Sequence, residues 1–131
     1  MDMKPSAEHV KEYIHRQLQA HNTPYMANSK DYSFHLEQDD SIIAGIVAES
    51  VEDTVEVAYL YVDPAFRGAG LGRQLMKQVE DQAADDGMKR VFLNTYSFQA
   101  PGFYRKMGYR LLFAIEPCLG DHGQYFFEKE L

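Results

Sequence analysis

The sequence predicts one α+β domain, a mixed and mostly antiparallel β-sheet with flanking helices. Several short runs alternate apolar and polar residues, as half-buried strands do, and two longer segments repeat their apolar residues at helical spacing. One helical segment lies between two strand-like runs, which indicates a β-α-β unit. The chain has 131 residues, of which 45% are hydrophobic. That length supports a single core, so we expect residues 1–131 to form one domain.

The first element expected is an amphipathic helix over residues 6–21. Ser6 is placed to cap its start, and a polar loop follows at residues 22–30. No strand-like run precedes this helix. The residues that define its apolar stripe are Val10, Tyr13, Ile14 and Leu18.

Three strands should follow in succession. Residues 32–37 alternate apolar and polar side chains, and residues 39–41 have the composition of a hairpin turn into a strand at 42–49. A second turn at residues 52–53 leads to a β-prone run at 55–62, which is expected at the centre of the sheet.

The second half should complete the sheet. Apolar residues from Leu71 onward repeat every three to four positions until Gly87, which predicts a helix with a glycine cap. A strand is expected at 90–96, and then a short helix at 98–107 ended by Gly108. The remaining ranges are a strand at 109–115, a turn at 120–123 and a last strand at 124–129.

The turn that joins residue 62 to the helix at Leu71 is basic and rich in glycine. The first N–H groups of a helix lack intrahelical partners and carry partial positive charge, so they bind anions. Glycines at 68, 70 and 72 let bulky oxygens approach the backbone, and Arg67 and Arg73 add guanidinium groups suited to phosphate. The sequence therefore predicts a pyrophosphate site here.

The spacing of the glycines excludes two common nucleotide motifs. A P-loop needs a lysine and a hydroxyl residue after its last glycine, whereas Arg73 and Gln74 follow Gly72. A dinucleotide fingerprint needs G-x-G-x-x-G, whereas these glycines are spaced two and two. A nucleotide-dependent phosphotransferase is therefore disfavoured.

The pattern Arg67-x-x-Gly70-x-Gly72 resembles the coenzyme A signature of the GNAT acetyltransferases. Residues 103–109 also resemble the F-Y-x-K-x-G-F/Y segment near the C-terminal end of that family. This resemblance implies the GNAT fold, acetyl-CoA as co-substrate and direct acetyl transfer to a primary amine of a small molecule, a protein lysine or a protein N-terminus. The alternative on the same fold is a non-catalytic acyl-CoA sensor or interaction module.

The resemblance also implies which residues bind the cofactor. The backbone of residues 60–62 would hold the pantetheine arm, and the glycine turn would hold the pyrophosphate. Ser97 stands where many family members carry a cofactor-binding asparagine, so Asn94 is a candidate substitute. The residues expected at the cofactor are Leu60, Tyr61, Val62, Arg67, Gly68, Ala69, Gly70, Leu71, Gly72, Arg73, Asn94, Ser97, Phe103 and Lys106.

Tyr104 is the general acid that the resemblance implies. A thiol of pKa about 8.5 leaves as an anion, and a phenol of pKa about 10 within reach can donate a proton to it. The alternative is a structural role for Tyr104 as a core aromatic residue beside Phe103.

The base that deprotonates the amine is expected to be Glu56 or water. Glu56 lies eleven residues before Arg67, where some GNAT members carry a glutamate base. On a regular strand it would share a face with Ala58, Leu60 and Val62, either partly buried with a raised pKa or inert at a solvated end. Glu49 and Glu52 are reserve candidates.

Composition narrows the remaining possibilities. The formal net charge of −7 gives no support for binding nucleic acid or an anionic membrane surface. Cys118 is the single cysteine, which excludes an intramolecular disulfide, and neither it nor the five histidines has the spacing of a metal site. No apolar run is long enough for a signal peptide or membrane span, so we expect a cytoplasmic protein. The short N-terminal part leaves the acceptor pocket open or completed by a second subunit in a homodimer.

Overall fold

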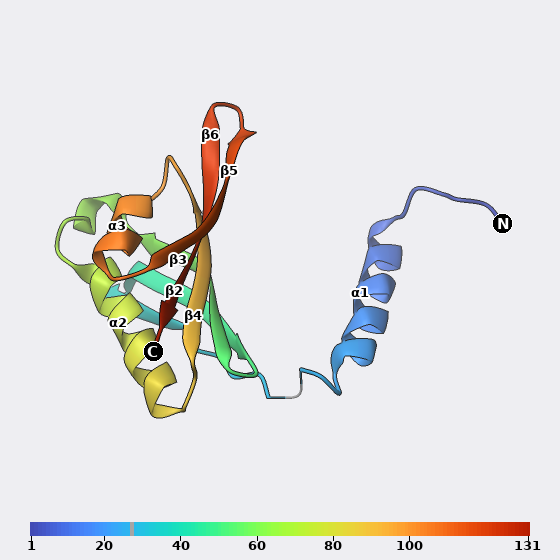
Figure 1. The fold of residues 1–131 in the computed structure, drawn as a ribbon, viewed down its shortest axis with the longest axis horizontal. Helices are drawn as coiled ribbons and strands as arrows, with labels where there is room; N and C mark the ends of the chain where they lie inside the picture. Colours follow the sequence, from blue (N-terminus) through green and yellow to red (C-terminus); the bar gives the residue numbers. More distant parts are fainter. Residues whose placement is uncertain (27) are drawn as a thin grey trace.

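The computed structural model describes residues 1–26 and 28–131, and Figure 1 shows one β-sheet with helices around it. Ala27, within the predicted loop at 22–30, lies outside the described residues. The strands are β1 (Phe34–Gln38), β2 (Ser41–Val51), β3 (Thr54–Val62), β4 (Arg90–Tyr96), β5 (Arg110–Leu119) and β6 (His122–Glu130). The helices are α1 (Glu8–Asn22), the 3₁₀ turn η1 (Pro64–Phe66), α2 (Leu71–Asp85) and α3 (Pro101–Lys106).

The sheet has the order β1-β2-β3-β4-β6-β5, and only the β3–β4 pair is parallel. Helix α2 connects these two strands, because parallel neighbours need a crossover segment. The predicted mixed, mostly antiparallel sheet with one β-α-β unit is confirmed.

Helices α2 and α3 lie against one face of the sheet, here called the inner face (Figure 1). The apolar stripe of α2 meets alternate residues of the central strands, so both are sealed from water. The fully buried large side chains there include Tyr32, Ile46, Met76, Val79, Leu93 and Phe127.

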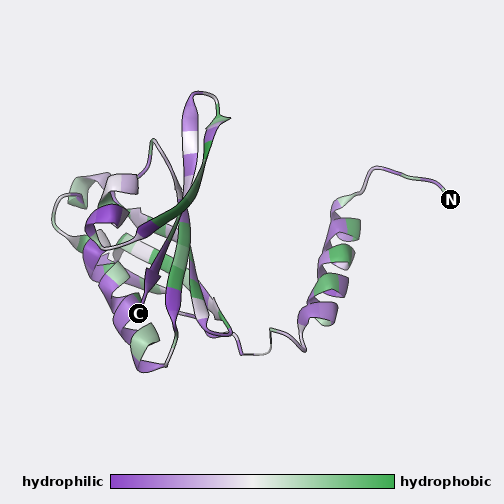
Figure 2. Cartoon of the chain, in the orientation of Figure 1, coloured by the Kyte–Doolittle hydropathy of each residue, from purple (hydrophilic) through white to green (hydrophobic). Residues whose placement is uncertain are grey.

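The opposite face, here called the outer face, has no described helix packed against it. Its members are Val47, Glu49, Glu56, Tyr59, Tyr61, Phe92, Asn94, Phe113, Ile115 and Phe126. Phe126 stacks on Phe113 and on Phe92, with ring centroids 4.4 and 6.2 Å apart. Figure 2 shows hydrophobic segments on this sheet and along α1.

Helix α1 stands apart from the rest of the protein (Figure 1). None of its residues is buried, and among the described residues no hydrogen bond or ion pair joins 1–26 to 28–131. The chain is anchored only after this segment: the Lys30 backbone N–H donates to Ser50 Oγ at 2.9 Å, and the Lys30 ammonium meets Asp86 at 2.7 Å.

Some expected boundaries differ from the structure. The Ser6 cap is wrong, because α1 begins at Glu8 after Ala7 and has no side-chain cap. Helix α3 starts at Pro101 rather than residue 98, because Gln99 Oε1 accepts the Tyr96 N–H at 2.8 Å and holds the preceding residues in a turn. Gly87 and Gly108 have φ of 82° and 91°, so both predicted glycine stops are confirmed.

Candidate active site

Strands β3 and β4 separate in the middle of the sheet. They pair only from Thr54 to Val57 on β3, after which β4 continues beside β6 alone. The register between β2 and β3 shifts at the same point, where Ala58 is an extra residue with no partner opposite it. This bulge turns β3 away, so the β4-facing backbone groups of residues 58–62 have no strand partner.

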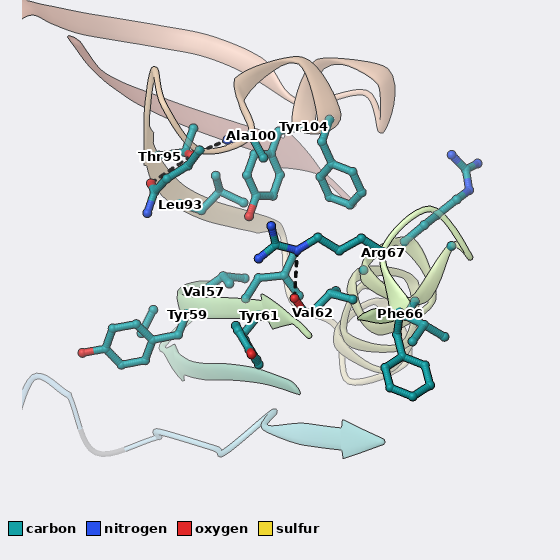
Figure 3. Close-up of a pocket in the computed structure, with 18 of the residues that line it drawn as sticks. Val57, Tyr59, Tyr61, Val62, Phe66, Arg67, Leu93, Thr95, Ala100 and Tyr104 are labelled. Carbon is teal, nitrogen blue, oxygen red and sulfur yellow. Dashed lines mark hydrogen bonds between the residues drawn. The ribbon is translucent and has the colours of Figure 1, made fainter. Parts of the chain in front are cut away.

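A cleft of about 840 Å³ occupies this separation (Figure 3). It runs from the point where β3 and β4 separate to the start of α2, and α3 closes one side. That volume lies within the usual range for small-molecule and cofactor sites. The lining includes Val57, Ala58, Tyr59, Leu60, Tyr61, Val62, Phe66, Arg67, Gly68, Gly70, Leu71, Gly72, Arg73, Leu93, Asn94, Thr95, Phe98, Gln99, Ala100, Phe103 and Tyr104.

The glycine turn presents the start of α2 to this cleft. Gly70 caps the helix with φ of 80°, a conformation that favours glycine, and the φ of Gly68 is 85°. The turn is fixed from below by Asp63, whose carboxylate accepts the Ala65 N–H at 2.8 Å. The first N–H groups of α2 are therefore held where an anionic group can reach them.

Tyr104 lies at the opposite end of the cleft. Its side chain is only 6% exposed and packs edge-on against Phe103 and Tyr109, with ring centroids 5.1 and 5.8 Å away. Figure 3 shows its hydroxyl directed into the cleft, between Leu93 and the bulged strand. Burial raises the pKa of Tyr104 to about 12, so the hydroxyl keeps its proton throughout the neutral and moderately alkaline range.

A buried polar group supports Tyr104 from behind. The Tyr109 hydroxyl donates to Glu80 at 2.7 Å, and the Lys129 ammonium donates to the same carboxylate at 2.9 Å and to the Met107 carbonyl at 2.8 Å. Burial and the neighbouring Glu80 carboxylate raise the pKa of Tyr109. These contacts tie α3 and β6 to α2, which fixes the ring of Tyr104 in place.

The Arg67 side chain turns back into the cleft rather than outward. Its Nε donates to the Val62 carbonyl at 3.0 Å, and Figure 3 places its guanidinium below the Tyr104 hydroxyl. In this conformation Arg67 engages one of the backbone groups that the sequence assigns to the cofactor arm.

The cleft contains most of the predicted cofactor residues. Ala69, Ser97 and Lys106 are the predicted members that do not line it. The Ser97 hydroxyl instead accepts the Gly123 N–H at 3.1 Å and lies 3.2 Å from His122 Nδ1, which fixes the β4–α3 turn to the start of β6.

Sequence reasoning missed a polar group at the end of β4. The Thr95 hydroxyl lies 3.2 Å from Gln99 Oε1 and accepts the Ala100 N–H at 3.3 Å, and all three residues line the cleft. The sequence does contain a signal for this group, because a threonine is followed four residues later by a glutamine, close to the proline that starts α3.

The expected face of Glu56 is wrong. The bulge at Ala58 reverses the alternation, so Leu60 and Val62 face inward while the exposed Glu56 lies on the outer face. Glu49 is directly opposite Glu56 on β2, and the described residues that line the cleft include no Asp, Glu or His. Glu49 and Glu56 thus lie on the outer face and outside the described lining of the cleft.

Neither a metal centre nor a membrane-spanning helix is found in the described part of the chain. Residues 1–26 and 28–131 contain no group of three or more His, Cys, Asp or Glu side chains placed to hold a metal ion. None of the described helices is long and apolar enough to span a membrane.

The fold is a mixed sheet with a cleft at a bulged central strand, and sequence comparison gives the family. The profile of the acetyltransferase (GNAT) family matches residues 3–109. The chain therefore belongs to this family and is an acetyltransferase.

Named relatives agree with this assignment. The chain is 39% identical over 91 residues to blasticidin-S acetyltransferase from Streptomyces morookaense, an alignment that covers 69% of this chain and 67% of that protein. It is 35% identical over 78 residues to IAA acetyltransferase from Azospirillum brasilense, covering 58% of this chain and 51% of that protein.

Solved structures share the fold. An acetyltransferase from Bacillus cereus superposes with a TM-score of 0.87 and 28% identity, covering 100% of this chain and 98% of that one. A streptothricin acetyltransferase from Bacillus anthracis, solved with acetyl coenzyme A, has a TM-score of 0.68 and 19% identity, covering 83% of this chain and 67% of that one.

Proposed function

We propose that this protein transfers the acetyl group of acetyl-CoA to a primary amine by direct attack. The observation that carries the proposal is the separation of β3 and β4, because it joins an anion-binding helix start to a buried tyrosine hydroxyl through one cleft. A long cofactor with a pyrophosphate at one end and a thioester at the other fits that arrangement.

The backbone of β3 would hold the reactive arm of the cofactor. Unpaired N–H and C=O groups of residues 58–62 can form strand-like hydrogen bonds with the two amides of pantetheine, as a neighbouring strand would. An N–H from the same segment can polarise the thioester carbonyl and stabilise the oxyanion of the tetrahedral intermediate. Arg67 would leave the Val62 carbonyl when the arm binds, which frees its guanidinium for the pyrophosphate.

The amine would approach from the outer-face side. Its lone pair attacks the thioester carbonyl carbon, a C–N bond forms, the C–S bond breaks, and the amine nitrogen loses a proton. Glu56 through a water, or water alone, would accept that proton. The described lining of the cleft contains no carboxylate or imidazole that could do so.

Tyr104 would act on the departing sulfur. With a pKa of about 12 against about 8.5 for a thiol, the phenol stabilises the developing thiolate chiefly as a hydrogen-bond donor. When Tyr104 gives its proton to the sulfur, the proton released from the amine would restore the phenol. The products are then the amide and the free thiol.

Titration calorimetry with acetyl-CoA tests the donor. We expect the parent protein to bind with a Kd in the micromolar range. Arg73→Gln should bind about tenfold more weakly or worse, because it removes a guanidinium suited to phosphate. Lys77→Gln, on the solvent side of α2, is the control and should bind as the parent does. Folded protein that binds no acetyl-CoA at high micromolar concentration would remove the cofactor from the proposal.

A thiol-release assay over an amine panel tests the acceptor. The relatives are named for blasticidin S and IAA, and a structural neighbour with 19% identity is a ribosomal-protein-S18-alanine N-acetyltransferase. The panel should therefore contain blasticidin S, a polyamine, a lysine peptide and a peptide with a free N-terminal alanine. Acetyl-CoA turnover at background with every class would overturn transfer to primary amines.

A further inference from the structure

Helix α1 has an apolar face that none of the residues described at 1–26 and 28–131 buries. Tyr13, Ile14 and Leu18 are 56, 55 and 56% exposed, and with Val10 they form one stripe along the helix. An isolated amphipathic helix of 15 residues is marginal in water, because most helical stability in proteins comes from packing of the apolar face. A partner surface is therefore required.

The outer face of the sheet is a surface of matching kind. Its apolar residues form a band across five strands, from Val47 on β2 through Tyr59 and Phe92 to Phe126 and Phe113. The stacked rings make the centre of this band flat and rigid. Glu56 is the β3 residue directly beside Phe92, so the band consists of Val47 and Tyr59 on one side of this glutamate and the aromatic cluster on the other. Exposed apolar side chains gathered on one face are typical of an interaction site.

We propose that α1 of one copy packs on the outer face of a second copy, and that two copies exchange these helices to form a homodimer. Each chain carries both the helix and the face, so a two-fold axis satisfies both at once. The interface would thus be isologous, with each surface used twice.

The dimensions of helix and sheet agree. A helix of 15 residues is about 22 Å long, and six strands span about 24 Å, so α1 can cross the sheet from edge to edge. Two such contacts in one dimer reach the order of area, about 1,200 Å² or more in total, that specific dimers bury.

The charges agree as well. Glu49 and Glu56 lie directly opposite each other on the outer face, where like charges destabilise a strand pair. The apolar stripe of α1 is flanked by Lys11 on one side and Arg16 on the other. A docked α1 can therefore bring a cation to the paired glutamates.

Docking of α1 would complete the acceptor side of the cleft, a consequence that rests on the proposed acetyl transfer. Tyr59, Tyr61 and Asn94 belong to the outer face and also line the cleft. The partner's helix would therefore border the opening through which the amine enters, whereas the cofactor end lies within one chain.

Sedimentation equilibrium of the full chain tests the dimer. We expect a dimer at micromolar concentration, and a rise of about 100-fold or more in its dissociation constant for Leu18→Glu. Gln19→Glu on the opposite side of α1 is the matched control and should leave the dimer intact. Because α1 makes no described contact with residues 28–131, the far-ultraviolet spectrum should show that the rest of the variant stays folded.

Photo-cross-linking identifies the surfaces. A Lys11→Cys, Cys118→Ser variant carrying a benzophenone on its cysteine is mixed with ¹⁵N-labelled protein, and cross-linked peptides are read by mass spectrometry. Links from unlabelled α1 to labelled outer-face peptides are expected. A monomer, links confined to one chain, or a dimer without links from α1 to the sheet would each overturn the proposal.

Acetyl-CoA binding separates the two proposals. Leu18→Glu should bind acetyl-CoA with an unchanged Kd, because the glycine turn and Tyr104 lie in one chain. If neither protein binds acetyl-CoA, the proposed function fails, while the masses and cross-links still decide the dimer.

Discussion

The two faces of the sheet use the same strands for different purposes. On the inner face, small and branched side chains of β2 and β3 meet α2, and the contact excludes water completely at residues such as Ile46 and Val79. On the outer face, large aromatic residues and two glutamates remain exposed on those strands. Burial on one side thus supplies stability, while the other side is left available for contacts outside the chain.

One residue separates these two roles along β3. Before Ala58 the strand follows a regular alternation, and after it the alternation is reversed and the pairing with β4 ends. The cleft therefore lies where β3 stops pairing with β4 and its backbone becomes accessible, and bulges are common at such places. Substitutions on either side of this boundary should have different kinds of effect.

The largest effect is expected for Phe127→Ala on the inner face. Phe127 is 0% exposed, so the variant should lose about 3–5 kcal/mol of unfolding free energy because a cavity replaces the ring. Phe113→Ala on the outer face is the control. That ring is 52% exposed and stacks only on Phe126, so we expect a loss of about 1 kcal/mol. Urea denaturation measures both, and equal losses would contradict the difference between the faces.

Tyr104→Phe sharpens the comparison at the cleft. We expect kcat to fall about 100-fold while the Kd for acetyl-CoA changes little, because in the proposed mechanism the hydroxyl acts only on the leaving sulfur. Tyr25→Phe, at an exposed position away from the cleft, should leave kcat unchanged. Since the pKa of Tyr104 is about 12, any loss of activity between pH 8 and 10 belongs to another group and should persist in the variant. Unchanged turnover would remove Tyr104 from the reaction.

Lys129→Met tests the polar support behind Tyr104. The side chain of Glu80 is 9% exposed, and removal of its ammonium partner leaves a buried carboxylate with only the Tyr109 hydroxyl. We expect a loss of about 2–3 kcal/mol in unfolding free energy. The control is Lys77→Met, which breaks an ion pair exposed at both ends and should change stability by about 0.5 kcal/mol or less. Similar losses for the two variants would contradict the stabilising role of the buried Lys129–Glu80 contact.

Glu56→Gln examines the outer-face side of the reaction. If Glu56 accepts the amine proton through water, kcat/KM should fall about tenfold. Glu49→Gln, at the directly opposite position, should leave kcat/KM unchanged. An unchanged kcat/KM in both variants would leave water alone as the base.

The sequence was informative where local pattern decides structure. The glycine turn, the stops at Gly87 and Gly108 and the β-α-β unit follow from backbone chemistry within a few residues, and the structure confirms them. The face of Glu56 could not be predicted in this way. It depends on one extra residue at Ala58, whose effect appears only when β3 is paired with β2 and β4.

Contacts between distant segments were equally inaccessible. Ser97 was expected at the cofactor because of its position in the family pattern, whereas its hydroxyl is engaged by Gly123 and His122 of β6. The sequence likewise predicted the apolar stripe of α1 but not that it would lie away from its own sheet. A stripe shows that a helix needs a partner and gives no information about which surface provides it.

The smallest effect on stability is expected for Asp86, which holds Lys30 and Tyr32 at the start of the sheet. Asp86 accepts hydrogen bonds from the Lys30 ammonium at 2.7 Å and the Tyr32 hydroxyl at 2.6 Å, and these bonds lower the pKa of its carboxyl group. A carboxyl group whose pKa is lower in the folded state stabilises the protein above its unfolded value of about 3.9, and the contribution is lost as the pH falls toward the folded value. Asp86→Asn should therefore be less stable than the parent at pH 7.

The pH dependence distinguishes this anchor from a general charge effect. The difference between parent and Asp86→Asn should shrink as the pH falls below about 4, because the parent alone loses the carboxylate contacts. Asp85→Asn, at the neighbouring exposed position, is the control variant. Tyr32 shares the contact, and burial with the Asp86 bond raises its pKa to about 12, so its own contribution persists up to about pH 10 and declines only as the pH rises toward 12. Thermal unfolding followed from pH 7 to 3 measures the acidic side. Parallel curves for all three proteins would mean that the anchor of the N-terminal segment does not depend on this carboxylate.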